Sequence, residues 1–231
     1  MSELYLIRHA RASFGSDSYD CLSAPGYRQS RLLGRYFCQR DITFDHRISG
    51  DLQRHRQTLK AMEEEMGDVD GARCTIHPGF NEYDFESMMR CYREQHPDDD
   101  LVRAQQQNPS DTKAYFRLLR RVLSEWGHHR LEGVPETWTE FERRVLDARA
   151  AITTIAGRGD RVLAISSGGA ISAFIGSVLG LSPEAIFDLN LQLRNTAICH
   201  FYFNREKFSL SGFNWLPHLD SPDRVDLVTY G

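Results

Sequence analysis

The sequence lacks three features that would assign the chain to a specialised class of protein. No stretch approaches the roughly 18 apolar residues that a membrane-spanning helix requires. The first residues contain neither a basic segment nor a long apolar one, so no secretory signal peptide is expected. Positive charge is not in excess, since the formal net charge is -4, and this argues against a general nucleic-acid-binding surface. We therefore expect a cytoplasmic protein with neither membrane nor nucleic-acid partners.

Cysteine is scarce and follows no pattern. The five cysteines are scattered and form no C-x-x-C pair, which argues against both a disulfide framework and a zinc knuckle. The nine histidines are also dispersed, and no metal site emerges from their spacing. Free cysteines fit a reducing cytosol, and we expect no metal site.

What remains is the composition of an ordinary globular protein. The 231 residues are 41% hydrophobic, 11% aromatic and 26% charged. This length suits one large domain, and two small domains are the less favoured alternative. No internal repeat and no low-complexity tract is visible.

Short apolar runs alternate with longer amphipathic stretches. The runs Leu4–Ile7 and Arg161–Ser166 have the length and character of buried strands. Ser23 and Pro25 form a helix-start signal, and a helix is expected from there to about Gln39. Further strands are predicted at Phe44–Ser49, Ala72–His77, Thr196–Phe203 and Phe208–Phe213, and further helices from a cap at Asp51 to Met66, from Gly168 to Gly180, and from Ser182.

This alternation predicts an α/β fold, a three-layer sandwich in which helices flank a mostly parallel central sheet. Residues 86–135 are more polar than their surroundings and mostly helical, with breaks at Pro97, at Asn108-Pro109 and at residues 133–135. We interpret this block as a helical insertion, because the strand at Arg161 must rejoin the first sheet. Residues 1–231 are therefore predicted to form a single domain that carries an insertion.

Three groups of polar residues lie next to predicted strand ends. Arg8 and His9 stand at the end of the first predicted strand. Arg54 lies in the first turn of the helix that follows the second predicted strand. Ser167 and Gly168 open the turn after a later strand. In open α/β sheets, ligands bind beyond the carboxyl ends of the strands. We expect the three groups to converge on one site, where helix N-termini and glycine backbone suit an anion.

A histidine beside two arginines suits phosphoryl transfer. A neutral imidazole can attack phosphorus and form a phosphohistidine, which water then hydrolyses. Arginines bind a phosphate dianion through paired hydrogen bonds, and their positive charge favours the neutral imidazole. Each group also has an ordinary structural interpretation when taken alone: a buried structural histidine, a solvated helix face, or glycines used only for packing.

Five segments match, in order, the motifs of one enzyme family. Leu6–Ala10 is similar to an L-x-R-H-G/A signature, and Gly50–Thr58 to an S-x-L-x-R-A-x-Q-T element. Leu22–Gln29 resembles a helix start written L-T-x-x-G-x-x-Q. Ser166–Gly169 resembles an S-H-G-G turn, and Arg194–Thr196 a late N-S/T element. Together, from residue 4 to about residue 203, they resemble the histidine phosphatase (phosphoglycerate mutase-like) superfamily.

The resemblance implies a role for each residue of the expected site. His9 would be the phosphoryl acceptor, with Arg8 and Arg54 binding the phosphoryl oxygens. Glu82 stands where the family keeps an acidic proton donor. It would protonate the leaving oxygen and then activate water. The alternative for Glu82 is a surface acid in a polar loop.

Two departures from the family pattern bear on activity. Ser167 stands where the family has a second histidine that donates to the phosphoryl group, so Ser167 and the Gly168 backbone remain as phosphate contacts. A hydroxyl brings no positive charge, and losing such a donor costs about 10²–10³ in rate. Gly15 replaces an asparagine of the mutases, and their E-R-x-Y-G stretch is absent at Glu82. A phosphatase is therefore favoured over a phosphoglycerate mutase.

No other histidine is expected to replace the missing one. His55 follows Arg54 but should point off its helix at a different angle. His200 lies inside a predicted strand, and His218 lies in a late loop that could fold over the site.

Three functions are compatible with the sequence. The first is a phosphomonoesterase that acts on a small phosphorylated molecule through a phosphohistidine on His9, with neither a metal nor an organic cofactor. The second is a phosphate-ligand binding pseudo-enzyme that keeps Arg8, His9 and Arg54 but turns over poorly. The third is a scaffold whose insertion docks a protein partner through apolar residues between Tyr115 and Val122, a spacing more typical of core packing. The identity of the substrate and a homo-oligomeric state are left open.

Overall fold

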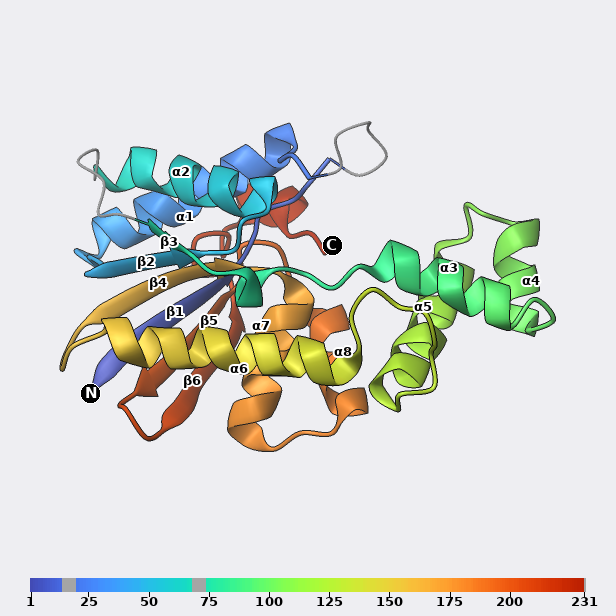
Figure 1. The fold of residues 1–231 in the computed structure, drawn as a ribbon. Helices are drawn as coiled ribbons and strands as arrows, with labels where there is room; N and C mark the ends of the chain where they lie inside the picture. Colours follow the sequence, from blue (N-terminus) through green and yellow to red (C-terminus); the bar gives the residue numbers. More distant parts are fainter. Residues whose placement is uncertain (14–19, 68–73, 231) are drawn as a thin grey trace.

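The architecture is a three-layer α/β sandwich, shown in Figure 1 for the computed structural model, which describes residues 1–13, 20–67 and 74–230. Within these residues six strands form one sheet in the order β3-β2-β4-β1-β5-β6. The pairs from β3 to β1 are all parallel, and β5 runs antiparallel to both of its neighbours. The predicted fold class is therefore confirmed. The strands are β1 (Ser2–Arg8), β2 (His46–Ser49), β3 (Cys74–Ile76), β4 (Arg161–Ser166), β5 (Ile198–Phe203) and β6 (Phe208–Trp215).

Helices cover both faces of the sheet (Figure 1). One face carries α1 (Ala24–Gln39) and α2 (Gln53–Met66), and the other carries α6 (Trp138–Ile155) and α7 (Gly168–Leu179). Helix α8 (Pro183–Gln192) packs on α7. The remaining elements are α3 (Phe85–Gln95), α4 (Asp100–Gln107) and α5 (Thr112–Gly127), with 3-10 turns at Pro78–Phe80 and Pro222–Leu227.

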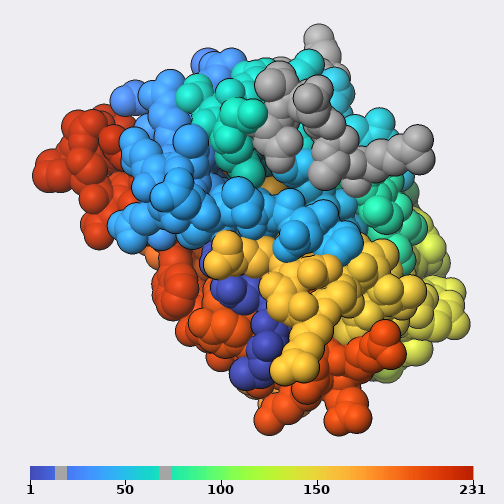
Figure 2. Space-filling view, turned by 90° about the vertical axis from the view of Figure 1, so that its left-hand side faces the viewer, coloured from blue at the N-terminus to red at the C-terminus, as the bar shows by residue number. Residues whose placement is uncertain are grey.

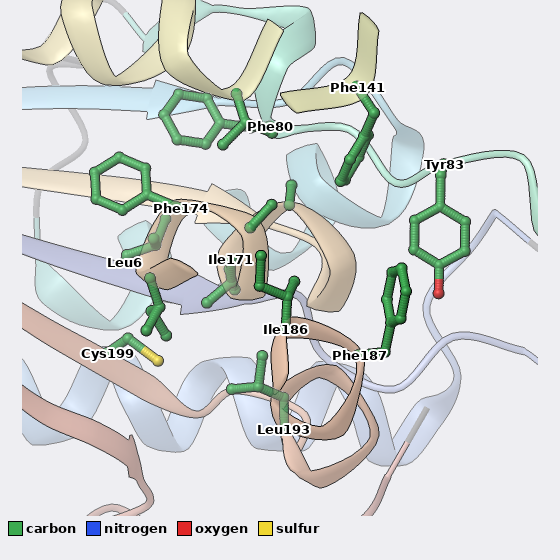
Figure 3. Close-up of a cluster of buried hydrophobic side chains, with 14 of the residues drawn as sticks. Leu6, Phe80, Tyr83, Phe141, Ile171, Phe174, Ile186, Phe187, Leu193 and Cys199 are labelled. Carbon is green, nitrogen blue, oxygen red and sulfur yellow. The ribbon is translucent and has the colours of Figure 1, made fainter. Parts of the chain in front are cut away.

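The two central strands bury side chains on both faces. Ile7 of β1 belongs to the smaller core under α1 and α2, together with Phe37 and Ile165. The neighbouring Leu6 points the other way, into the larger core around Phe174 of α7 (Figure 3). Successive side chains of a strand point to opposite faces, so a strand covered on both sides is apolar at every position. This is why these strands appear in the sequence as continuous apolar runs.

The first strand lies in the middle of the sheet and is joined to distant parts of the chain. Leu4 is opposite Val162 of β4 on one side and Phe201 of β5 on the other. Figure 2 looks at the end of the molecule where the chain begins, and the dark blue N-terminal residues lie between amber and orange-red ones. The carboxyl end of β1 is thereby fixed beside segments from the last third of the chain.

Most predicted helix starts are observed, but one is wrong. Ser23 caps α1 and accepts a hydrogen bond from the Gly26 amide. Asp51, in contrast, does not cap α2: the N-cap is Leu52, which makes no side-chain capping bond. The acceptor comes from elsewhere in the chain, since the amide of the first helical residue donates to Asp20 Oδ2 at 2.7 Å. The predicted start of the third strand at Ala72 lies outside the described residues.

Helices α3, α4 and α5 stand beyond one end of the sheet (Figure 1). Leu118, Leu119 and Val122 of α5 are buried in the larger core, as the interpretation of their spacing as core packing expects. Trp126, near the end of α5, stacks on Phe187 of α8 with ring centroids 6.4 Å apart. The chain then returns to add β4 to the middle of the sheet. The description of residues 1–231 as one domain with an insertion stays a prediction.

Among the helices in the described part of the chain, none is both long and apolar enough to cross a membrane.

Candidate active site

The predicted groups meet where the carboxyl ends of β1 and β4 face the N-termini of α2 and α7. His9 follows β1 directly, and its amide donates to Ser166 O at 2.8 Å. Arg54 is the second residue of α2, and Ser167 is the N-cap of α7. The Gly50 amide, just before α2, donates to Ile165 O at 3.1 Å. The backbone alone therefore holds three distant segments of the sequence together.

His9 is held as a neutral imidazole with a defined tautomer. Its Nδ1 lies 2.8 Å from Ala10 O, and a carbonyl can only accept, so Nδ1 carries the proton. The lone pair is then on Nε2. Burial lowers the pKa of His9 well below its ordinary value, and the positive charges of Arg54 and Arg8 lower it further. The ring is therefore neutral at physiological pH, with the lone pair of Nε2 free of a proton.

The loop after His9 is held by residues of the sequence motifs. The Ala10 amide donates to Thr58 Oγ1 at 3.0 Å, and the Arg11 amide donates to Gln29 Oε1 at 2.9 Å. Gly26 allows α1 to approach this loop, because a Cβ built there would overlap Arg11 O. These motif residues thus hold the backbone that follows His9.

The late N-S/T element, Asn195-Thr196, also holds the carboxyl end of β1. Asn195 Nδ2 donates to His9 O at 3.2 Å, and the Thr196 amide donates to Arg8 O at 3.1 Å. Thr196 adopts φ 58°, in the left-handed region that a β-branched residue enters rarely. Its amide and hydroxyl are both used there, the hydroxyl lying 2.9 Å from His218 Nε2.

Both arginines lie within the site, each anchored by an acceptor. Arg8 Nη1 donates to Leu193 O. The guanidinium also lies beside the turn before α7, since a Cβ built on Gly168 would be 3.5 Å from Arg8 Nε, an ordinary contact distance. Arg54 Nη1 donates to Asp20 Oδ1 at 2.8 Å. Asp20 was not identified from the sequence, because it lies in a polar segment with no helix or strand pattern.

Glu82 lies at the N-terminus of α7 and not in an isolated polar loop. The Gly169 amide donates to both carboxylate oxygens, at 3.1 and 3.3 Å. A Cβ on Gly169 would overlap Glu82 Oε1, so the glycine is needed for this contact. Arg144 of α6 holds the loop by donating to Asn81 O at 2.8 Å and to Glu82 O at 3.3 Å. The carboxylate is thereby placed beside the turn that also contacts Arg8.

His55 is also part of the site, so the prediction that it points away is wrong. It is fully buried, its ring centroid is 5.6 Å from that of His9, and its Nε2 lies 2.7 Å from Ser167 Oγ. Burial lowers the pKa of His55 well below its ordinary value, and the charge of Arg54 lowers it further. The physical reason is Gly50: with no Cβ there, the imidazole can lie over the backbone before α2.

The two remaining histidines of interest have structural contacts. His200 is buried in β5, with its Nε2 3.0 Å from Glu3 Oε2, in line with the structural role expected for it. His218 is buried against Thr196, and burial, with a smaller effect of Arg224, lowers the pKa of His218 to about 3.

Within the described ranges, no cluster of histidine, cysteine and acidic side chains has the arrangement of a metal site. Gly15, which stands in place of the mutases' asparagine, lies outside the described residues.

Comparison with known proteins identifies relatives over nearly the whole chain. The sequence model of the histidine phosphatase superfamily (branch 1) matches residues 4–216. A protein of Salmonella choleraesuis (strain SC-B67), named Probable phosphoglycerate mutase GpmB, is 26% identical over 233 residues, which cover 96% of this chain and 97% of that protein.

Solved structures share the fold. A mutant phosphoserine phosphatase from Entamoeba histolytica in complex with phosphoserine superposes with a TM-score of 0.65 at 17% identity, covering 95% of this chain and 100% of that one. An alpha-ribazole phosphatase from Shigella flexneri gives a TM-score of 0.63 at 19% identity, covering 92% and 96%. At such identities the likeness concerns the fold alone.

Proposed function

Since this chain belongs to the histidine phosphatase superfamily (branch 1), we propose that it is a phosphatase that hydrolyses a small phosphomonoester through a phosphohistidine on His9. The observation that carries the proposal is the state of His9. The ring is buried and neutral, Ala10 O fixes its proton on Nδ1, and Arg8 and Arg54 supply positive charge next to it. A neutral nucleophile beside two guanidinium groups suits a phosphoryl group, whose oxygens arginines bind through paired hydrogen bonds.

In the first step, His9 Nε2 attacks the phosphorus of the bound ester. The N–P bond forms while the bond from phosphorus to the ester oxygen breaks, and Glu82 gives its proton to the departing oxygen. Arg8 and Arg54 bind the phosphoryl oxygens, where negative charge is spread in the transition state. The products of this step are phosphohistidine, the free alcohol and a Glu82 carboxylate.

In the second step, the Glu82 carboxylate takes a proton from a water molecule as the water oxygen attacks phosphorus. The N–P bond breaks and its electron pair returns to His9 Nε2. Inorganic phosphate leaves, and both side chains regain their starting states. The hydrogen bond from Nδ1 to Ala10 O is kept throughout, so the ring does not turn between the two steps.

A test of this proposal is to trap the phosphoenzyme. We expect brief incubation with p-nitrophenyl phosphate, followed by an alkaline quench, to add one phosphate to the peptide that contains His9. The adduct should be labile in acid and absent from His9→Ala. His200→Gln provides the matched control, because it removes a buried histidine that lies outside the site. An adduct that persists in His9→Ala would remove His9 from the mechanism.

Two further readouts separate the phosphatase from its alternatives. Released phosphate is measured with p-nitrophenyl phosphate, and isomerisation of 3-phosphoglycerate is measured in parallel, because the Salmonella relative is named a phosphoglycerate mutase. Steady release of phosphate without isomerisation is the expected result. Binding of inorganic phosphate with neither phosphoenzyme nor turnover would instead identify a phosphate-binding pseudo-enzyme.

A further inference from the structure

A second imidazole lies beside the proposed phosphoryl acceptor and has no role in the steps above. The rings of His55 and His9 have centroids 5.6 Å apart and planes tilted by 38°. His55 Nε2 lies 2.7 Å from Ser167 Oγ, and both side chains are fully buried. The pair therefore joins the N-terminus of α2 to the N-terminus of α7 at the point where the acceptor histidine emerges from β1.

Ser167 is bracketed by residues that contact the reacting groups. The residue before it, Ser166, accepts a hydrogen bond from the His9 amide at 2.8 Å. The residue after it, Gly168, lies against the guanidinium of Arg8. Although Ser167 is the N-cap of α7, its side chain makes no capping bond. Its hydroxyl is therefore committed to His55 and not to the helix.

The contact between His55 and Ser167 depends on a third residue. A Cβ at Gly50 would overlap His55 Nδ1, so any larger residue would displace the ring. Gly50, His55 and Ser167 are also three positions where the sequence departs from the motifs it resembles, which have serine, alanine and histidine there. All three departures lie in one chain of contacts. Compared with the motifs, the imidazole is supplied by His55 of α2, and the turn before α7 supplies the small hydroxyl side chain of Ser167.

The hydrogen-bond partners indicate which way the pair is polarised. Among the described residues, none makes a hydrogen bond to the buried Nδ1 of His55, whereas Nε2 has the Ser167 hydroxyl. A neutral imidazole carries one N–H, and a buried N–H without an acceptor is rarely tolerated. The proton therefore belongs on Nε2, which donates to Ser167 Oγ. The proton of the serine hydroxyl is then available to another acceptor.

We propose that His55 and Ser167 act together as the second phosphoryl-stabilising group of the site. His55 Nε2 donates to Ser167 Oγ and orients the serine hydroxyl, which donates to an oxygen of the transferring phosphoryl group. Ser167 is then a catalytic residue and His55 a positioning residue that acts through it. The inference rests on the proposed function, and it assigns to two side chains on different helices the task for which the S-H-G-G motif has one histidine.

The first test compares two replacements of His55 of similar size. His55→Gln keeps an N–H at about the reach of Nε2, whereas His55→Leu fills the space without a donor. With p-nitrophenyl phosphate we expect His55→Leu to lower kcat by about tenfold or more while KM changes by less than about threefold. His55→Gln should keep most of the activity. His200→Gln, a buried histidine outside the site, should resemble the unmodified protein.

The second test moves the imidazole back into the turn. Ser167→His alone should not help, because the new ring meets His55, and His55→Ala alone should lower kcat by about tenfold or more. The double variant removes the obstacle and supplies the imidazole from position 167. We expect its kcat to exceed that of either single variant, a non-additive result that independent sites would not give. A double variant whose loss equals the product of the single losses would overturn the proposal.

A third measurement detects a role in the transition state even where turnover is low. Orthovanadate mimics the transferring phosphoryl group, and inorganic phosphate mimics only the bound ground state. A group that acts in the transition state should matter more for vanadate. His55→Leu should weaken inhibition by vanadate about tenfold and inhibition by phosphate much less. Equal effects on the two anions would show a merely structural role for His55.

The outcomes distinguish this inference from the proposed function. Each variant is first required to unfold at a temperature close to that of the unmodified protein. If the unmodified protein forms phosphohistidine and turns over, and a folded His55→Leu retains its kcat, only the role of His55 and Ser167 is overturned. If the unmodified protein forms no phosphohistidine and releases no phosphate, the proposed function fails and this inference fails with it.

Discussion

Three glycines of the site are required by the atoms that lie against them. A Cβ on Gly168 would overlap Asn190 Oδ1, and one on Gly169 would overlap Glu82 Oε1. A Cβ on Gly50 would meet the ring of His55. In a sequence, adjacent glycines after a strand are weak evidence of function, because strand-to-helix packing uses them too. The structure gives each glycine a more specific reason, since each makes room for a polar side chain.

A prediction at the scale of single residues follows from Gly50. Gly50→Ala should lower the free energy of unfolding by about 1–3 kcal/mol, the usual cost of overpacking, and should lower kcat because it displaces His55. In a His55→Ala background the same change should cost less, and the remaining cost comes from Asn81 Oδ1, which a Cβ at Gly50 would also overlap. Chemical denaturation of the four proteins in this cycle gives the coupling, expected to be about 0.5–3 kcal/mol. Additive effects would show that the two residues do not compete for the same space.

The site was predictable from the sequence only in part. Arg8, His9 and Arg54 could be selected because strand ends and helix starts are visible in the pattern, and such ends converge in α/β sheets. Glu82 was expected only from the resemblance to the family motifs. His55 could not be placed in the same way. The direction of a side chain in the first turn of a helix depends on what lies beside it, here a glycine outside the helix and a hydroxyl more than a hundred residues away.

At the scale of elements, the start of α2 depends on a residue outside the helix. Asp20 accepts from the Gln53 amide at 2.7 Å and from the side chain of Arg54 at 2.8 Å. The carboxylate therefore acts as the missing N-terminal acceptor of α2 and also orients an arginine of the proposed phosphate site. Negative charge at this helix end is also favoured by the helix dipole.

Replacement of Asp20 provides the test of this arrangement. Asp20→Ala should lower the free energy of unfolding by about 0.5–2 kcal/mol, the typical cost of losing an N-terminal cap. Asp51→Ala is the matched comparison, because Asp51 was the cap expected from the sequence but does not cap the helix. Urea denaturation of both variants should show the larger loss for Asp20→Ala. The opposite order would restore Asp51 as the cap.

The elements themselves were largely predictable, and their errors have physical causes. Ser23 could be predicted as the cap of α1 because the capping bond is local: its hydroxyl accepts a hydrogen bond from the amide of Gly26, in the helix that it starts. Residues 161–166 were recognised as a strand because both faces are buried. The cap of α2 was missed because its acceptor is remote in sequence, and local propensity contains no information about a partner 33 residues away.

At the scale of the whole molecule, the fold holds three buried histidines in the neutral state. Burial lowers the pKa of His9 and His55 well below 6.5, and lowers that of His218 to about 3. In the unfolded chain the same side chains are solvated and titrate near 6.5. As pH falls below that value, the unfolded state binds protons that the folded state does not accept. The free energy of unfolding must therefore decrease with falling pH.

The decrease in the free energy of unfolding with falling pH has an expected size that urea denaturation can test. Between about pH 7.5 and about pH 5.5, each such histidine should lower the free energy of unfolding by about 1.4 kcal/mol. Urea denaturation across this range should show a decrease in the free energy of unfolding equal to the sum for the three histidines. The free energy of unfolding should not rise again at the acid end of the range. His218→Gln should reduce the pH dependence by the share of one histidine, whatever its effect on stability at neutral pH. A flat profile would mean that these side chains do take up protons in the folded protein.

The position of β1 also sets when the site around His9 can form during synthesis. The strand that ends at His9 is synthesised well before its neighbours in the sheet, β4 (Arg161–Ser166) and β5 (Ile198–Phe203). Pairing at such sequence separation makes folding slow, because long loops must close before the contacts form. A growing chain that stops before residue 161 therefore has no partner for β1 among the described strands of this sheet. Phosphorylation of His9 in the proposed reaction would then wait for the synthesis of β4 and β5, and labelling of stalled chains would report when these two strands have paired with β1.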